Sequence, residues 1–400
     1  MKSIMQPYAN ITIYPLATST QKGRCLLLYG NQYYEVSCHV VELINELQQK
    51  TTEEEAIASY IKIKEGKYSV EQVEYIIDKC ITPIFQKKEK KKRTFLYEKE
   101  LFPTSVIDSF SDAFRFLFHK TCMVVVFTLV LCMDVYFFWH TEDLLVFNNS
   151  VNIYIVVGLL LFMFLSSLFH ELGHASACKH FELRHGGIGF GLYLNFPVLY
   201  TDVTEVWKLN RKQRFVVNIA GVYFQSLCMI GLLIGFFLTG NNMLRYLILI
   251  MNFGFLMTLN PFFKFDGYWI MSDLLGVPNL RSRSKELLSY LYNFIRKRPV
   301  EQKPYLLQVE TAEKWGMLLY SIVVNLFMGF YFFFIIPSFL YRFVLSFPKE
   351  IQDLIMYLSN NLTPPFALLR NISMQLIFLA LIIFFITKFI QSLKKRHDKS

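Results

Sequence analysis

Residues 151–174 read VNIYIVVGLLLFMFLSSLFHELGH, an apolar run of membrane-spanning length that ends in a His-Glu-x-x-His motif. A helix needs about 20 apolar residues to cross a bilayer. On a helix, His170 and His174 share one face and both imidazoles can ligate one zinc ion, while Glu171 can take a proton from metal-bound water. The alternative is a pair of helix-end histidines at a membrane interface, with a solvated Glu171 between them.

The composition is that of a membrane protein. Hydrophobic residues make up 54 % of the chain, with 40 Phe and 23 Tyr, and the mean hydropathy is +0.34. A soluble domain of this size could not bury so much apolar surface. No apolar signal segment opens the chain, so the first span is expected to direct insertion. Six spans are predicted, with limits near 120–139, 151–170, 214–239, 243–261, 314–338 and 373–391.

The distribution of Lys and Arg predicts the orientation of these spans. A basic run at 87–93 precedes the first span, the segments 175–213 and 262–313 are rich in Lys and Arg, and the tail ends KKRHDKS. The segment 140–150 has neither residue, and 339–372 has only three. The positive-inside rule then places both termini and the His-Glu motif on the cytoplasmic side of the cell membrane.

The formal charge of +10 fits this asymmetry and an attraction to anionic lipid. Nucleic acid is therefore not an expected partner. The seven Cys are scattered, odd in number and without Cys-x-x-Cys spacing, so we interpret them as reduced packing residues.

The first 90 residues predict a small α+β, winged-helix-like domain ahead of a mainly α membrane part. Gly30-Asn31 is a hairpin signal between strands at 24–29 and 32–36. Three helices follow, near 39–49, 52–63 and 69–84, the last two opened by capping boxes. We therefore divide the chain into a cytoplasmic domain (1–90), a basic linker or interfacial segment (91–119), a six-helix membrane domain (120–391) and a basic tail (392–400).

A hydrolytic zinc site needs a third protein ligand. His180 follows His174 at the spacing of the HExxHxxGxxH pattern, but Ala177 replaces its chain-breaking Gly. On a continued helix, His180 would point about 120° away from His174. Asp266, in LNPFFKFDGY, closes the fourth span at the same predicted depth and side as the motif. A carboxylate there is costly unless it is paired or metal-bound, so we favour Asp266 as the third ligand.

The two motifs HELGH and NPFFKFDG, each at the end of a span, resemble those of the site-2 protease family of intramembrane zinc metalloproteases. Members carry HExxH on one transmembrane helix and N-P-D-G elements on another, with the Asp as third ligand. The resemblance covers roughly 110–290, and the stretch from Tyr200 to Gly221 resembles the peptide zinc metalloprotease branch. The N-terminal domain resembles PqqD-like modules, which bind leader sequences of ribosomally made peptides.

The resemblance implies a membrane protease with one Zn²⁺ per chain that matures or clears a small peptide. Its expected partners are the lipid bilayer, a peptide substrate or precursor leader, and neighbouring biosynthetic or export proteins. A PDZ-like insertion, which many members use to gate substrate, is absent from this sequence.

Two further segments have candidate roles in peptide hydrolysis. Asn260 could donate a hydrogen bond to the oxyanion, or could simply cap a helix before Pro261. Residues 185–203 are Gly-rich with partial alternation, which predicts an interfacial strand or hairpin that an extended substrate could join, or else a bridging loop. His185 within it is interpreted as a surface histidine.

Several polar residues lie within the predicted spans. Asp134 is interpreted as an outer-interface residue, with pairing to a neighbour as the alternative. Interhelical hydrogen bonds are expected of Asn218, Gln225 and Asn252.

Two other functions compete with proteolysis. One is a non-catalytic peptide export or immunity factor with a structural metal site, and the other is a metal-ion transporter. Glu171 favours hydrolysis, because a structural site needs ligands but no general base. A transporter would need polar or acidic residues through several spans, and these are sparse.

Overall fold

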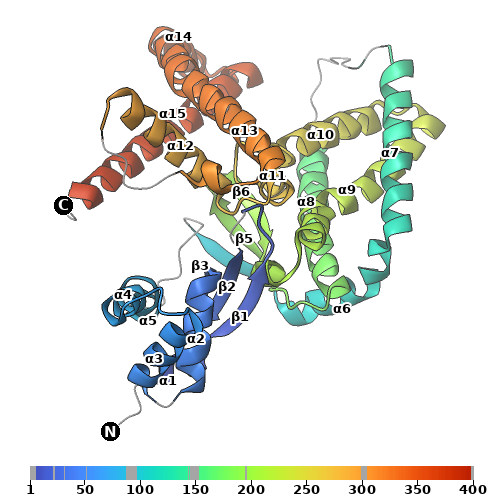
Figure 1. The fold of residues 1–400 in the computed structure, drawn as a ribbon. Helices are drawn as coiled ribbons and strands as arrows, with labels where there is room; N and C mark the ends of the chain where they lie inside the picture. Colours follow the sequence, from blue (N-terminus) through green and yellow to red (C-terminus); the bar gives the residue numbers. More distant parts are fainter. Residues whose placement is uncertain are drawn as a thin grey trace. The chain divides into compact units, whose positions relative to one another are not determined.

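A computed structural model describes residues 6–20, 23–30, 32–50, 52–86, 97–142, 144, 153–193, 196–298 and 304–397 (Figure 1). The chain divides into two compact units. One comprises 1–191 and 197–318, and the other comprises 192–196 and 319–400. Helices dominate both, which confirms the prediction of a mainly α polytopic membrane protein with a small strand-containing N-terminal domain.

The N-terminal domain contains an antiparallel sheet of three strands. These are β1 (Thr12–Leu16), β2 (Arg24–Tyr29) and β3 (Gln32–Ser37), in the order β1-β2-β3. The predicted pairing of β2 with β3 is confirmed up to Tyr29 and Gln32, and Gly30 has the positive φ of 59° that a tight turn favours, while Asn31 lies outside the described residues. Strand β1 was not predicted, because Pro15 interrupts its pattern; an edge strand tolerates that proline.

Helices cover this sheet and share its core. They are α1 (Gln6–Ala9), α2 (Cys38–Gln49), α3 (Glu53–Ile63), α4 (Val70–Ile76), a π-helical turn (Ile77–Ile81) and α5 (Thr82–Gln86). The three predicted helices are therefore confirmed. The third corresponds to α4, the π-helical turn and α5, which follow one another without a break. The Thr52 hydroxyl accepts from the Glu55 N–H, and Ser69 with Gln72 forms a full capping box. Leu27, Leu43, Ile44 and Tyr60 are among the buried residues of the core.

The segment between this domain and the first span is structured where it is described. It forms β4 (Glu98–Phe102), α6 (Thr104–Phe114) and a 3₁₀ turn (Arg115–Phe118). β4 pairs antiparallel with β5 (Ile188–Tyr193), which neighbours β6 (Phe196–Thr201) in a sheet of order β4-β5-β6. The strands predicted within 185–203 are confirmed. Their partner β4 was not expected.

The His-Glu motif lies on α8 (Ile153–His180), which packs against α9 (Arg211–Thr239). α9 also packs against α7 (Lys120–His140) and α10 (Asn242–Thr258) (Figure 1). α8 continues ten residues beyond the predicted limit of the second span, to His180, which is the continued helix that Ala177 predicts. The motif therefore lies within a helix and not at its end.

Five helical stretches of the described residues are long and apolar enough to cross a membrane. The predicted fourth span is the exception, because α10 has 17 residues, fewer than the 20 or so that a bilayer needs. After α10 come α11 (Asp266–Leu275), α12 (Leu280–Ile295) and a 3₁₀ turn, η4 (Tyr305–Gln308); another 3₁₀ turn (Thr204–Lys208) precedes α9.

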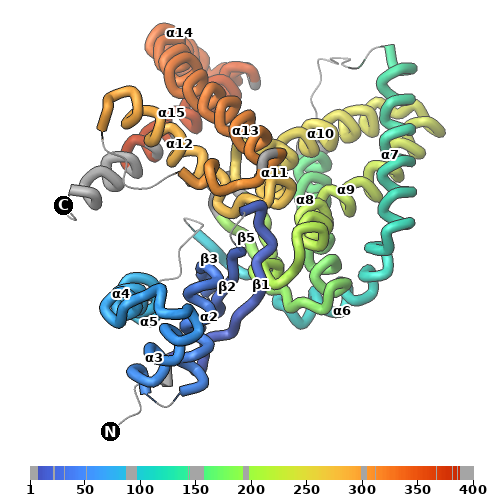
Figure 2. Tube along the Cα trace, in the orientation of Figure 1, coloured from blue at the N-terminus to red at the C-terminus, as the bar shows by residue number. Residues whose placement is uncertain are grey.

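The C-terminal helices run longer than predicted. α13 (Thr311–Phe330) continues through a π-helical turn (Tyr331–Ile335) into α14 (Ile336–Ser359), a continuity that Figure 2 shows. α15 (Phe366–His397) then begins seven residues before the predicted span. Residues 339–372, predicted only as the connection between two spans, are thus mostly helical, in α14 and the start of α15. Aromatic residues four apart, such as Phe339 and Phe343 with ring centroids 6.0 Å apart, support helix there, and Pro348 does not end it.

Candidate metal centre

Glycines let α8 and α9 approach closely beside the motif. An added Cβ at Gly173 would lie 2.4 Å from the Ala220 carbonyl oxygen, and one at Gly221 would lie 2.3 Å from Cε1 of His170. Neither position has room for a larger residue. Small residues commonly permit such close crossings in membrane helices. The approach brings hydrogen-bond acceptors of α9 within reach of both motif imidazoles.

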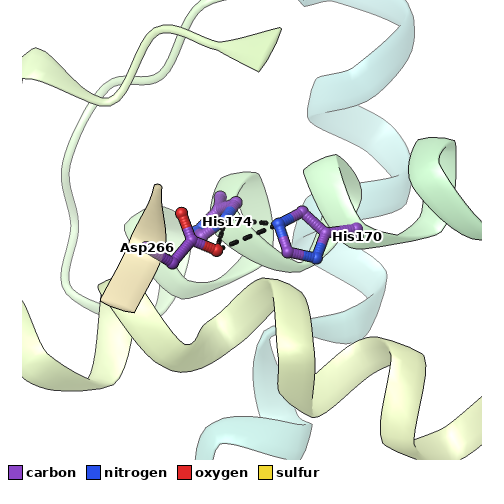
Figure 3. A group of neighbouring side chains, drawn as sticks. All are labelled: His170, His174 and Asp266. Atoms are coloured by element: carbon purple, nitrogen blue, oxygen red, sulfur yellow. Dashed lines mark hydrogen bonds and ion pairs between the residues drawn. The ribbon is translucent and has the colours of Figure 1, made fainter. Parts of the chain in front are cut away.

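His170 and His174 project from α8 toward Asp266, the first residue of α11 (Figure 3). The two Nε2 atoms lie 3.2 Å apart. Oδ2 of Asp266 lies 3.0 Å from Nε2 of His170 and 3.2 Å from Nε2 of His174. The three side chains are mostly buried: His170 is 12 % exposed, His174 9 % and Asp266 21 %. The structure thus brings together the three residues that the sequence nominated as ligands.

Hydrogen bonds on the far side of each imidazole determine which nitrogen faces the cluster. Nδ1 of His174 lies 2.8 Å from the Val217 carbonyl oxygen, which can only accept, so Nδ1 carries the hydrogen and Nε2 keeps its lone pair. Nδ1 of His170 lies 3.1 Å from Oε1 of Gln225, whose amide nitrogen donates to Ser166 Oγ at 3.0 Å. Both Nε2 lone pairs therefore point at one carboxylate oxygen.

Three electron-rich atoms this close repel one another unless a cation lies between them. Asp266 Oδ2 is also buried and accepts no hydrogen bond. An Asp carboxyl is ordinarily ionised at neutral pH, and the ionised form is the one that ligates zinc. Tetrahedral zinc at roughly 2.0–2.2 Å from N and O ligands separates those ligands by about 3.3–3.4 Å. The observed separations of 3.0–3.2 Å are slightly shorter, so the three ligand atoms would move apart by a few tenths of an ångström around a bound ion.

Gln225 was predicted only to join helices, yet it contacts a predicted ligand. We expect Gln225→Leu to weaken zinc binding by roughly 10–100-fold, because the His170 ring loses the acceptor that fixes its tautomer and orientation. Gln225→Glu keeps an acceptor and should bind zinc within a few-fold of wild type. Competition with chelators of graded affinity measures this constant.

Asn252→Leu is the matched control for Gln225. It removes another amide hydrogen bond between helices, the 2.9 Å bond from Asn252 Nδ2 to Asp134, and leaves the cluster untouched. Zinc affinity should stay at the wild-type value in this variant. Equal losses in Gln225→Leu and Gln225→Glu would mean that the acceptor at residue 225 has no positioning role.

Glu171 and Asn260, the two other predicted site residues, are near the ligands in the sequence. Glu171 is buried, 8 % exposed, and its backbone carbonyl accepts a 3.4 Å hydrogen bond from the Thr201 hydroxyl at the end of β6. Asn260 Oδ1 accepts from the Phe262 N–H at 2.8 Å, which makes the turn after α10, whose C-cap is Leu259. Catalytic roles for Glu171 and Asn260 stay predictions.

The remaining histidines near the motif are used elsewhere. His180 ends α8 and lies tilted against Phe118, with ring centroids 6.1 Å apart, so it is not part of the cluster, as the continued helix predicts. The prediction that His185 is a surface residue is wrong, since it is 7 % exposed. Nε2 of His185 lies 3.0 Å from Ser111 Oγ and 3.4 Å from Asp108 Oδ1, so both residues contact the same ring nitrogen. A Ser-His-Asp triad needs the acid at the other nitrogen, so this cluster is structural.

The helix that carries Asp266 is anchored at its opposite end. Asp273 accepts hydrogen bonds from Nε of Arg214 at 2.6 Å and from Nδ2 of Asn218 at 2.7 Å. Asp273 and Arg214 form a buried ion pair, with side chains 8 % and 4 % exposed, respectively. Arg211 Nε donates to the Asp273 carbonyl at 2.9 Å. α11 is therefore bonded to α9, the helix that also orients both imidazoles, and a lone charge left by mutation here would be costly.

A loop of the N-terminal domain holds the same helix end. Ser19 Oγ donates to the Leu275 carbonyl at 2.7 Å, and the Ser19 N–H donates to the Gly276 carbonyl at 3.0 Å. Gly276 has φ +61° and no space for a Cβ, which would fall 2.2 Å from Ser19 Oγ. The β1–β2 connection thus contacts the helix whose first residue is Asp266.

The expected hydrogen bonds between span residues are present. Asn218 reaches Asp273 on α11, Gln225 reaches Ser166 on α8, and Asn252 reaches Asp134 on α7. For Asp134 the pairing alternative is therefore right.

Comparison with known proteins supports a metalloprotease at a coarse level. The chain is similar to the "Putative peptide zinc metalloprotease protein YydH" of Bacillus subtilis (strain 168), with 26 % identity over 121 residues. The matched part is 30 % of this chain, and it spans about half (48 %) of the relative's length. No protein-family model matches the chain. No solved structure matches it either.

Proposed function

We propose that this protein is an intramembrane zinc metalloprotease of the site-2 protease type, which hydrolyses a bond in a small peptide or membrane-inserted substrate. The observation that carries the proposal is the convergence of two Nε2 lone pairs and an ionised carboxylate oxygen within 3.2 Å, next to Glu171 in sequence. The similarity to a protein named as a peptide zinc metalloprotease supports the same class and the peptide substrate.

His170, His174 and Asp266 would hold the ion, which when bound supplies a Lewis acid and lowers the pKa of water to about 7. Glu171 then takes the proton from the attacking water and later delivers it to the leaving amine. Asn260 uses its amide oxygen in the turn, so its N–H₂ group is the part that could donate to the carbonyl oxygen of the scissile bond. Burial of Glu171 keeps bulk water from that carboxylate.

The β4-β5-β6 sheet offers a surface for an extended substrate. β5 is paired with β4 on one side, so the sheet order leaves β6 at an edge, where a peptide could pair as a further strand. Thr201 of β6 contacts the Glu171 backbone, so a peptide on this edge would run close to the proposed base. We assign the N-terminal domain the role of a leader-peptide reader, and its loop at Ser19 links that domain to the Asp266 helix.

Metal removal tests the proposal directly. With peptides encoded by neighbouring genes as substrates, the detergent-purified protein should yield two fragments by mass spectrometry. Cleavage should cease after zinc is stripped with a chelator and return when one equivalent of zinc is restored.

Two results of that experiment would reject the protease. Zinc-loaded protein that cleaves none of these peptides but melts at a lower temperature without metal would be an export or immunity factor with a structural metal. Zinc flux into lipid vesicles that contain the reconstituted protein in their membrane, again without cleavage, would indicate a transporter.

A further inference from the structure

α12 carries an apolar face that the described chain covers only along its first half. Leu280 and Ser284 on this face are buried, at 0 % and 1 % exposed, where α12 packs near η4. At 100° per residue the same stripe continues along the helix. The later side chains of this stripe are exposed: Leu288 (46 %), Leu291 (51 %), Tyr292 (49 %) and Ile295 (71 %).

This exposure needs an explanation separate from that of the spans. Exposed apolar residues on the span-length helices are expected, because lipid tails surround such helices. α12 has 16 residues and is not among the helices long and apolar enough to cross a membrane. A contiguous apolar stripe outside a span is the mark of a surface that something else covers.

Cations border the exposed part of the stripe. Lys285 and Arg296 lie beside it, and Lys297 and Arg298 follow it; all four are exposed. The Arg296 guanidinium lies 4.5 Å from the Tyr292 ring centre. The only acid of the helix, Glu286, is already paired with Arg283 at 2.7 Å. An apolar stripe with basic borders is typical of helices that lie in a membrane interface.

We propose that the Leu288–Ile295 face of α12 lies in the headgroup layer of the cytoplasmic leaflet and binds anionic lipid. Its charge favours this occupant, because the phosphate groups of anionic lipids attract Lys and Arg within a Debye length of the surface. Tyr292 suits the depth at which aromatic residues anchor helices. The Arg281 N–H donates to the Tyr268 hydroxyl at 3.3 Å, so a lipid-bound α12 would also restrain the helix that carries Asp266.

Photo-crosslinking in vesicles tests the proposal. The photoreactive residue benzoylphenylalanine replaces Leu291 in the full chain, and the exposed Ser282 on a different face of α12 serves as the matched site. Vesicles are made of phosphatidylcholine with or without phosphatidylglycerol, and adducts are identified by mass. We expect lipid adducts at residue 291, few at 282, and a higher yield with phosphatidylglycerol.

A variant with Lys285, Arg296, Lys297 and Arg298 replaced by Gln should reduce the yield at 291 by roughly tenfold. Adducts at 291 with protein or an added peptide would overturn the proposal, and so would equal lipid adducts at 291 and 282. A yield that neither phosphatidylglycerol nor the Gln variant changes would refute the part about anionic lipid. None of these readouts depends on zinc or on cleavage.

Discussion

Glu171→Gln is expected to retain one zinc per chain and to lose cleavage by roughly 10²–10⁴-fold or more. The amide keeps the size of the side chain but cannot accept a proton from water, and general-base catalysis is worth about that factor. Since His170, His174 and Asp266 are unchanged, the ligand cluster stays whole. The measurement pairs metal content of the purified protein with the rate of fragment formation.

Asp266→Ala separates the roles of ligand and base. It removes one of three ligands, so both zinc content and cleavage should fall together, whereas Glu171→Gln should lower cleavage alone. Asp202→Ala is a suitable control, because it removes a carboxylate that lies outside the cluster and bonds to Thr204. If Glu171→Gln cleaved at the wild-type rate, the proposed base would be wrong. If Asp266→Ala kept both zinc and activity, the third ligand would have to be sought elsewhere.

The sequence predicted the cluster because its signals are local. HELGH fixes two side chains on one helical face, and charge asymmetry placed Asp266 at the same membrane depth. Ala177 correctly argued for a continued helix and against His180 as a ligand. Each inference needed only spacing along one element or a rule about its flanks.

The features that were missed depend on pairing between distant segments. β4 carries Glu98 and Lys99, which give no apolar alternation, and its strand forms because β5 supplies a partner 90 residues later. Gln225 looked like any interhelical amide until the crossing of α8 and α9 placed His170 beside it. Residues 339–359 were interpreted as part of the connection between two spans, whereas they belong to α14, which contains Pro348 in its interior.

Gly221→Ala should lower zinc affinity by 10-fold or more, for a reason that no sequence pattern shows. The added Cβ would lie 2.3–2.5 Å from Cε1, Nε2 and Nδ1 of His170, so either the imidazole leaves its position or α8 and α9 move apart. Overpacking of this kind typically costs about 1–3 kcal/mol of folding stability as well. Chelator competition and a thermal melt, measured on the same sample, separate the two losses.

Gly231→Ala on the same helix is the matched control, because nothing lies within 4 Å of its added Cβ. It should keep wild-type zinc affinity and gain slightly in stability, since Ala favours a helix over Gly. A Gly221→Ala protein that melts normally but binds zinc weakly would show that close helix crossing serves the metal centre itself. Wild-type zinc affinity in that variant would contradict the position of the His170 ring, and with it the cluster on which the proposed function rests.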